Sequence, residues 1–385
     1  MKRWAVLLMA IGLVFSAGAV FPTSTGQNPI VSSFTPLGSL YSGVDFHSQP
    51  WDISADGTTV VGNTGGLAFH WTEATHMVEL PSILGPGIGS GGDGVSADGS
   101  MAAGTTSTSI GSEACRWTWV VDETGHGAWV PEGLGDLEGG SYGSVGYAMS
   151  ANGNIVVGFG NSTKGQEACR WTFVPDDANG GGTWVPEGLG DLPGGNFGSE
   201  AYGCSADGSV VVGDSAIRNG WRAYRWTKET GMKDLGVVGN RKWGVAFGCS
   251  GDGLVVVGES FANRGRDEVA FRWTQGTGMV GLGDLPGGKT LSEAEATNYD
   301  GSIVVGWSAT ARGMEAFVWD AQNKMRSVEN VLATKGIFIP SGWRLKAASG
   351  VTSNGGVVTI VGSAVYTVDS IQYNEGFIAV IADYR

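Results

Sequence analysis

The stretch Ser54-Ala55-Asp56-Gly57-Thr58-Thr59-Val60-Val61-Gly62 decides the fold, because the chain repeats it. Six further copies follow, and the last of them is degenerate. The Asp or Asn positions are 56, 98, 152, 207, 252, 300 and 354, which are separated by 42, 54, 55, 45, 48 and 54 residues. Seven copies at this period are typical of propeller blades, not of a short-repeat β-helix or a helical solenoid.

Each copy begins with two strands joined by a tight turn. Asp-Gly between short apolar segments is a strong hairpin signal, because such turns need the positive φ that Gly adopts at little cost. In the fourth copy, a first strand at 201–205 turns at Asp207-Gly208 into Val210-Val211-Val212-Gly213. The Val-rich run is apolar on both faces, as expected for a blade packed between two neighbours.

A third strand and a fourth strand complete each copy. The third follows the pattern of Ala223-Tyr224-Arg225-Trp226-Thr227, and the fourth is exemplified by residues 278–283, which run into Asp284-Leu285-Pro286-Gly287-Gly288. We therefore predict an all-β fold, one seven-bladed β-propeller with four-stranded blades, over residues 34–385. The Trp of the third strand is expected in the core at positions 71, 117, 171, 226, 273 and 319.

The seventh copy lacks a fourth strand, and the N-terminal region offers one. Thr35-Pro36-Leu37-Gly38-Ser39-Leu40 resembles the fourth-strand phrase Gly281-Leu282-Gly283-Asp284-Leu285 but follows no complete copy. We predict that residues 34–40 pair antiparallel with residues 376–382. This pairing would close the ring and remove the exposed sheet edges.

The first residues have the pattern of an export signal. Lys2 and Arg3 precede an apolar run from Trp4 to Phe15, and small residues follow at 17–19. We assign residues 1–19 to a signal peptide and residues 20–33 to a linker, and expect a secreted protein, extracellular or periplasmic. An uncleaved anchor is the alternative, but the run is short for a membrane span. No span is expected after signal removal.

The repeats resemble the bacterial extracellular HAF-repeat family, whose copies combine an S-x-DG-x-VVG element with HAF-x-W and LGDLPGG elements. The resemblance covers residues 34–383 and implies export and a propeller-like fold. It implies no common activity. The chain departs from the family at the name-giving His, a slot that holds Leu67, Glu113, Glu167, Arg222, Val269, Glu315 and Glu375.

Composition excludes several classes of partner. The 385 residues include 67 Gly and 15 Trp, with 23 basic and 37 acidic residues and a formal charge of −14. A nucleic-acid groove needs clustered Lys and Arg, so no nucleic-acid partner is expected. The excess of acidic over basic residues also disfavours docking on an anionic membrane surface. We expect a monomer.

No catalytic or metal-binding constellation is visible, so no metal and no cofactor are expected. The four His share no ligand spacing, and His70 stands in a slot that is Arg in other copies. Each Asp-Gly turn offers one carboxylate, whereas calcium takes six to eight oxygens. We expect the Arg residues that occupy this slot in other copies to pair with carboxylates of their own blades, such as Asp136, Asp191 and Asp284. The alternative is that these Arg residues form a ring that binds a substrate. These Arg residues are Arg116, Arg170, Arg225 and Arg272.

The four Cys stand at equivalent positions of neighbouring copies, Cys115 with Cys169 and Cys204 with Cys249. Such positions are too far apart for a disulfide, which needs a Cα separation of 4.4–6.8 Å. Free thiols are therefore expected, with Cys204–Cys249 as the candidate exception.

Aromatic residues outside the repeat pattern are the candidate ligand-binding residues. Several lie in loops that join second to third strands or fourth to next first strands, which share one rim of a propeller. Aromatic platforms beside polar residues stack on sugar rings, although a loop aromatic as often covers its own blade edge. The candidates are Tyr142, Phe197, Trp221, Trp243 and Trp307.

The leading hypothesis is a secreted binding or scaffold protein that recognises a polysaccharide or a cell-surface partner through rim loops. The alternative is a polysaccharide-active enzyme, a lyase or glycoside hydrolase, which a pair of rim carboxylates within about 10 Å would favour. A structural surface-layer component is a third option. The rim-candidate carboxylates are Glu167, Glu259, Glu268 and Glu315.

Overall fold

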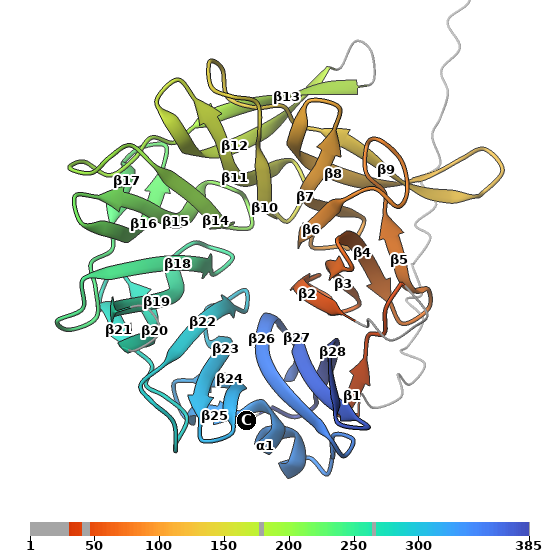
Figure 1. Ribbon diagram of the computed structural model, residues 1–385, viewed down its shortest axis with the longest axis vertical. Coiled ribbons are helices and arrows are strands. Elements are labelled where there is room, and N and C mark those ends of the chain that lie inside the picture. Colours follow the sequence, from red (N-terminus) through yellow and green to blue (C-terminus); the bar gives the residue numbers. More distant parts are fainter. Residues whose placement is uncertain (1–30, 41–46, 177–180, 264–266, 385) are drawn as a thin grey trace, which may run out of the picture. The chain divides into compact units, whose positions relative to one another are not determined.

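A computed structural model describes residues 31–40, 47–176, 181–263 and 267–384. Seven four-stranded antiparallel sheets follow one another around a ring (Figure 1), so the predicted seven-bladed β-propeller is confirmed. The predicted signal peptide, residues 1–19, and most of the predicted linker lie outside the described residues. No described helix is long and apolar enough to cross a membrane.

Every blade has its strands in sequence order from the axis outward, except that the last takes its outer strand from the N-terminal region. The innermost strands are β2 (Ser48–Ile53), β6 (Ser90–Val95), β10 (Val145–Met149), β14 (Ser199–Cys204), β18 (Trp243–Cys249), β22 (Ser292–Thr297) and β26 (Trp343–Asn354). The second strands are β3 (Thr59–Thr64), β7 (Met101–Thr108), β11 (Ile155–Ser162), β15 (Val210–Ile217), β19 (Val255–Asn263), β23 (Ile303–Thr310) and β27 (Val357–Val368).

The third strands are β4 (Leu67–Thr72), β8 (Gly111–Val121), β12 (Gly165–Asp176), β16 (Gly220–Thr227), β20 (Asp267–Thr274), β24 (Gly313–Asp320) and β28 (Ile371–Ile381). The outer strands are β5 (His76–Leu80), β9 (Gly127–Gly133), β13 (Gly181–Gly188), β17 (Gly231–Asp234), β21 (Gly278–Gly281), β25 (Lys324–Ser327) and β1 (Ser33–Pro36).

The apolar pair before the Gly of each second strand, which is Val-Val in five of the seven blades, packs toward both neighbouring blades. Val60 lies in a cluster with Val361 of the last blade, and Val61 lies in a cluster with Val95 and Ala102 of the second blade. Both Val side chains are fully buried. The prediction from the apolar run is therefore confirmed, and the burial of these side chains between blades stabilises the ring.

The Gly that ends each Val-Val-Gly run lies beneath a β-bulge of the innermost strand. Across β14 and β15 the register shifts between Ala201 and Gly203, which leaves Tyr202 as the extra residue. A Cβ on Gly213 would lie 2.0 Å from the carbonyl oxygen of Glu200. Only Gly permits this approach, and the same crowding recurs at all seven copies.

The Asp-Gly turns are capped internally and linked to one another. Ser205 Oγ donates to Asp207 Oδ1 at 2.7 Å, and Asp207 Oδ1 also accepts from the Ser209 backbone N–H at 3.0 Å. The Ala206 N–H donates to the Gly251 carbonyl of the next turn at 2.9 Å. Equivalent turn-to-turn bonds join the first six blades in series.

The seventh hairpin departs from this pattern. Thr352 pairs with Thr359 and stands where the other copies have their Ser, so the sequence assignment of Ser353 to that position is wrong by one residue. The hairpin continues for two more pairs and turns at Gly355-Gly356. Thr352 Oγ1 donates to the Ala55 carbonyl at 2.8 Å and so joins the last turn to the first.

The ring closes as predicted. Strand β1 pairs antiparallel with β28, from Ser33 opposite Val380 to Pro36 opposite Phe377. The ladder is shorter than predicted, because only the Leu37 N–H, which donates to the Gly376 carbonyl at 2.9 Å, extends it beyond Pro36. Every second residue of β1 forms backbone hydrogen bonds to β28, and Pro36 lies between two such residues. Its missing N–H therefore removes no hydrogen bond from the ladder.

One helix interrupts the β-architecture in the described part of the chain. Helix α1 (Val328–Thr334) begins after Ser327, whose Oγ accepts a hydrogen bond from the Asn330 N–H. It buries Val328, Val331 and Leu332 between the sixth and seventh blades. The spacing i, i+3, i+4 gives the helix one apolar face.

The predicted pairing with a carboxylate of the same blade is confirmed for two of the four repeated Arg residues, but the Asp partners named for them are wrong. Arg116 and Arg170 pair with Glu132 and Glu187, at 2.9 and 3.0 Å, across the third and fourth strands. Arg225 and Arg272 instead donate to the turn carbonyls of the next blades, Gly253 and Gly301. Asp136 follows the C-terminal end of β9, where it accepts the Leu137, Gly143 and Asn161 backbone N–H groups.

All four Cys are free thiols, including Cys204 and Cys249, as predicted for equivalent positions on adjacent blades. Cys115 and Cys169 are buried among apolar residues. Burial raises the pKa of the Cys249 thiol to about 12, so this group stays protonated at neutral pH.

Candidate functional site

The rim formed by the second-to-third turns and the inter-blade loops carries a pocket between the fourth and fifth blades. Its volume is about 440 Å³. The first and second strands of blade four supply one side, and the start of β18 supplies the other. The lining residues are Glu200, Tyr202, Asp214, Gly220, Trp221, Trp243, Val245 and Phe261.

Two indoles from different blades border the pocket. Trp221 follows the turn between β15 and β16 and is 39% exposed. Trp243 begins β18, and its indole N–H donates to the Asn219 carbonyl of blade four. Its ring lies 5.7 Å from that of Phe261. Both indoles are among the candidates named from the sequence, and the fold brings them to one pocket.

Two carboxylates lie opposite each other on the pocket floor. Glu200 in β14 and Asp214 in β15 are cross-strand partners in the ladder. Like charges in directly opposite positions destabilise a sheet. A contribution to stability therefore does not explain why these two carboxylates face each other. Asp214 is only 7% exposed.

Phenol and amide donors hold the Glu200 carboxylate. Tyr202 donates its hydroxyl to Oε2 at 2.9 Å, and Gln166 donates to Oε1 at 2.7 Å. Tyr147 reaches Oε2 at 3.4 Å. Burial, and then the charges of Asp214 and Glu200, raise the pKa of Tyr202 well above its usual range. The phenol therefore stays protonated and remains a donor.

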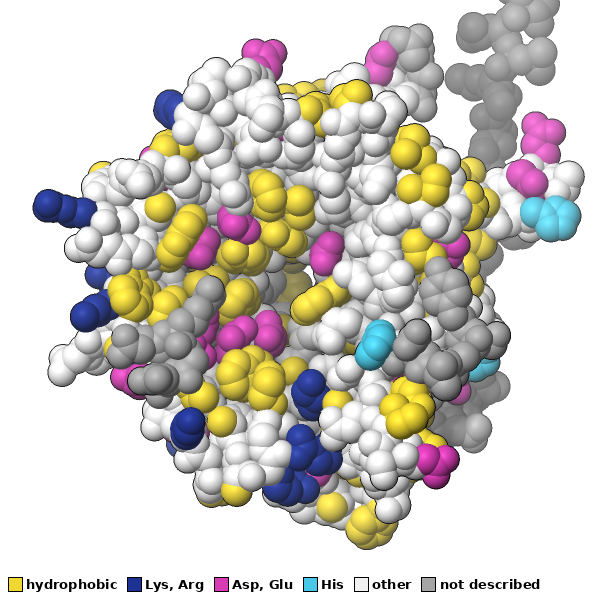
Figure 2. All heavy atoms as spheres, viewed as in Figure 1, with side chains coloured by type: hydrophobic (Ala, Val, Ile, Leu, Met, Phe, Trp, Pro, Cys, Tyr) yellow, Lys and Arg dark blue, Asp and Glu magenta, His cyan; other side chains and the backbone are white. Residues whose placement is uncertain are grey.

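The bulged residues of the innermost strands form a second group of functional candidates around the axis. Tyr147, Tyr202 and Phe247 follow one another from blade to blade, with ring centroids 5.3 and 5.7 Å apart. Asp93 and Glu295 are the bulged residues of blades two and six. Figure 2 shows carboxylates and apolar side chains together around the central opening.

Burial raises the pKa of Asp93 to about 7. It also raises the pKa of Glu295 to about 7, where hydrogen bonding from Glu293 opposes the rise and the charge of Glu259 adds to it. These carboxyl groups therefore change charge near neutral pH. The described residues hold no group of three or more His, Cys, Asp or Glu arranged to bind a metal ion.

The other predicted aromatic residues lie outside this pocket. Tyr142 lies over the Gly111 turn, and its hydroxyl hydrogen bonds to Glu113. Phe197 lies beside the Gly165 turn, with Lys164 Nζ 5.2 Å from its ring. Trp307 lies within β23, opposite Glu293, and not in a loop.

The predicted rim carboxylates also do not converge. Glu167 Oε1 accepts the Gly190 N–H at 2.9 Å, as Glu113 and Glu375 accept those of Gly135 and Gly38. The shared geometry assigns these three Glu residues a structural role at the loop after the outer strand. Glu259 and Glu268 are almost fully buried.

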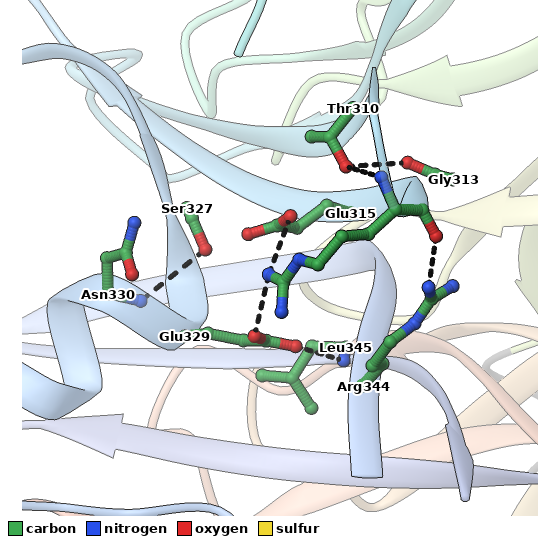
Figure 3. Close-up of polar contacts among 9 residues, drawn as sticks. Thr310, Gly313, Glu315, Ser327, Glu329, Asn330, Arg344 and Leu345 are labelled. Carbon is green, nitrogen blue, oxygen red and sulfur yellow. Dashed lines mark hydrogen bonds and ion pairs between the residues drawn. The ribbon is translucent and has the colours of Figure 1, made fainter. Parts of the chain in front are cut away.

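Glu315 belongs to an ionic network between blades six and seven (Figure 3). Arg312 donates to Glu315 at 2.9 Å and to Glu329 of helix α1 at 3.2 Å. Glu329 also accepts the Leu345 N–H at 2.9 Å, and the Arg344 guanidinium donates to the Arg312 carbonyl. This network fastens α1 to the ring, which leaves Glu315 no free role in a rim cleft.

Sequence reasoning missed Glu200 and Asp214. The sequence places Asp214 directly after Val-Val-Gly, but the position of Glu200 opposite it depends on a bulge at Tyr202 that the sequence does not mark. Only the register of the antiparallel ladder shows that these two positions face each other.

Known proteins match this chain only at the level of structure, and only distantly. No family model matches the chain, and no curated protein matches it. An oligogalacturonate lyase from Vibrio parahaemolyticus is 13% identical with a TM-score of 0.48, over 91% of this chain and 97% of that one.

Two other solved structures are similar at the same level. TolB from Acinetobacter baumannii is 12% identical, with a TM-score of 0.41 over 82% of this chain and 75% of that one. The β-propeller domain of the Trilobed protease from Pyrococcus furiosus is 10% identical, with a TM-score of 0.44 over 86% and 98%. These likenesses do not indicate a ligand or an activity for this chain.

Proposed function

We propose that this protein is a secreted binding protein of the HAF-repeat type that recognises a polysaccharide through the pocket between blades four and five. The observation that carries the proposal is the convergence of Trp221 and Trp243 on the paired carboxylates Glu200 and Asp214. Indole faces stack on sugar rings, and carboxylates accept hydrogen bonds from sugar hydroxyls. The protein is proposed to act as a monomer.

The charge of the pocket narrows the class of polysaccharide. The chain carries a net charge of −14, and no Lys or Arg lines the pocket. A polymer of uronic acids would bring further negative charge to Glu200 and Asp214. Neutral sugars and amino sugars are therefore the proposed ligands, because an ammonium group pairs with a carboxylate.

A glycan array on the purified mature protein tests the proposal. The expected hits are neutral or amino-sugar oligosaccharides, and Trp221→Ala should weaken binding to them at least tenfold. Phe338→Ala is the matched control, because Phe338 is an 81% exposed aromatic outside the pocket. Binding that survives Trp221→Ala, or hits confined to acidic glycans, would contradict the proposal.

A glycoside hydrolase is the second candidate, and the Glu200–Asp214 pair favours it. Directly opposed positions bring two carboxyl groups within the range that glycosidases use, roughly 5–10 Å. Each hit from the array should be incubated with the protein and examined for shorter products. Release that disappears in both Glu200→Gln and Asp214→Asn would assign hydrolysis. Binding without release would assign recognition alone.

A further inference from the structure

The opposite face of the ring, where the Asp-Gly turns lie, carries an aromatic pocket between blades one and two. Its volume is about 350 Å³. Trp119 and Trp129 of blade two form one wall, and His70 and Val78 of blade one form the other. The remaining lining residues are Thr59, Thr72, Thr75, Asp98, Gly99 and Ser100.

The next interface around the ring shows what this aromatic pair accommodates. Between blades two and three, the guanidinium carbon of Arg116 lies 4.9 Å from the ring centroid of Phe173 and 4.7 Å from that of Trp184. Arg116 also donates to the Gly153 carbonyl of the neighbouring turn and pairs with Glu132. A cation beside aromatic faces is electrostatically favourable.

The two aromatic pairs correspond in position and geometry. Trp119 and Trp129 are cross-strand partners, as are Phe173 and Trp184. Their ring centroids lie 5.5 and 5.4 Å apart, with interplanar angles of 61° and 57°. The aromatic receptor for a guanidinium is therefore present at both interfaces.

The group that fills the receptor differs. His70 occupies the Arg116 slot and hydrogen bonds to the Gly99 backbone of the next turn, and its ring lies 4.7 Å from that of Trp129. An imidazole is shorter than an Arg side chain, so open volume remains in front of the indoles. Val78 stands opposite His70, where Glu132 stands opposite Arg116.

Electrostatics favour a cation in the open volume. Burial lowers the pKa of His70 to about 4, so the imidazole is neutral at pH 7. Hydrogen bonds from Ser100 lower the pKa of Asp98, which is therefore ionised. No Lys or Arg is among the lining residues.

We propose that the pocket between blades one and two binds the guanidinium group of an arginine supplied from outside the chain, beside Trp119 and Trp129. The ligand is free arginine or an arginine side chain of a partner peptide. This site is independent of the proposed polysaccharide pocket, which lies on the other face. A single cation–π site at a partly open surface predicts weak binding, with Kd on the order of 1 mM for the isolated group.

Titration of the full mature protein with N-acetyl-arginine methylamide tests the proposal, with tryptophan fluorescence or NMR as the readout. The citrulline analogue is the matched control, because it has the same shape without the charge. The arginine compound should saturate a single site and the citrulline compound should bind at least tenfold more weakly. Free arginine and an arginine-containing peptide, titrated in parallel, distinguish the two sources.

Two substitutions exchange His and Arg between the equivalent positions 70 and 116, so that each copy of the repeat serves as a control for the other. His70→Arg should fill the pocket as Arg116 fills its neighbour, and should weaken binding at least tenfold without loss of thermal stability. Arg116→His should open an equivalent site beside Phe173 and Trp184, and so raise the stoichiometry from one to two. Trp221→Ala should leave the titration unchanged.

Equal binding of the citrulline compound, or unchanged binding to His70→Arg, would overturn the proposal. Should His70→Arg fail to fold, Trp119→Leu provides the same test, because Trp119 is 44% exposed and its replacement leaves the core intact. Saturation that persists in Trp119→Leu would equally overturn it.

Discussion

At the residue scale, the Gly of Val-Val-Gly is a position where a Cβ would clash with the backbone of the innermost strand. Gly213→Ala would place a methyl group 2.0 Å from the Glu200 carbonyl oxygen, so the bulge of β14 must shift. We expect a loss of about 2 kcal/mol in the free energy of unfolding, the size typical of overpacking. Urea denaturation monitored by tryptophan fluorescence measures it.

Gly276→Ala is the control for this substitution. Gly276 has open space around its Cβ position and no positive φ, so Ala there should be neutral or slightly stabilising. Equal stability of the Gly213 and Gly276 variants would contradict the account of the bulge.

Asp93 should make stability depend on pH near neutrality. Its carboxyl pKa is raised by burial to about 7 in the folded protein, above the unfolded value, so the folded state binds the proton more tightly. Its ionisation therefore destabilises the fold progressively as pH rises from about 4 to about 7. Asp93→Asn should raise stability by up to about 4 kcal/mol at pH 8 and change little at pH 4, as thermal denaturation at both values would show. A gain of the same size at both pH values would contradict this assignment.

Residue-scale contacts were the part that sequence reasoning predicted least well. The Arg of the third strand was correctly expected to need a partner, but Glu132 and the turn carbonyls are selected by strand register and by the next blade. The pairing of Glu200 with Asp214 depends on the same register. The bulge also escaped prediction, because an extra residue leaves no mark in an alternating pattern.

At the element scale, the Asp-Gly turn depends on one carboxylate oxygen. Asp207 Oδ1 accepts from Ser205 Oγ, the Ser209 N–H and Ser209 Oγ, and these bonds lower the pKa of Asp207. Asp207→Ala should cost about 1 kcal/mol at pH 7 in urea denaturation. Asp207→Asn should cost less, because Asn152 makes the corresponding bonds to Ser150 and Asn154 in blade three.

The lowered pKa of Asp207 leads to a separate prediction about stability at acidic pH. Since the folded pKa of Asp207 lies below its unfolded value, its contribution is complete above about pH 4 and is lost as pH falls through the folded pKa. The stability difference between wild type and Asp207→Ala should therefore shrink below pH 4. A difference that stays constant to pH 2 would show that the carboxylate charge plays no part.

Elements that repeat were predictable, and elements that occur once were not. The four strands of each blade follow from patterns that seven copies reinforce. Helix α1 lies in the one connection without a parallel in other copies, and its apolar stripe is only two turns long. The seventh hairpin was misaligned because Gly355-Gly356 replaces the Asp-Gly signal.

At the scale of the whole molecule, closure joins residues more than 300 positions apart. Leu37 is buried between the first and last blades, Phe34 packs on Phe377 and Trp343, and the Gly38 N–H donates to Glu375 at 3.0 Å. Every other blade gains its outer strand from local sequence, whereas the last blade depends on the N-terminal region. Loss of β1 would therefore expose the edge of β28 from Phe377 to Val380.

Deleting residues 20–41 from the mature chain should cause a cooperative loss of stability together with aggregation, because the freed edge of β28 can pair with another molecule and Leu37 no longer seals the joint between blades. Thermal denaturation and size-exclusion chromatography measure the two effects. Val31→Asp is the control, because Val31 precedes the ladder and is exposed. A deletion variant that elutes as a monomer and melts within a few degrees of the full mature chain would show that β1 only covers a blade that is already stable, and that six complete blades and a three-stranded seventh suffice to hold the ring.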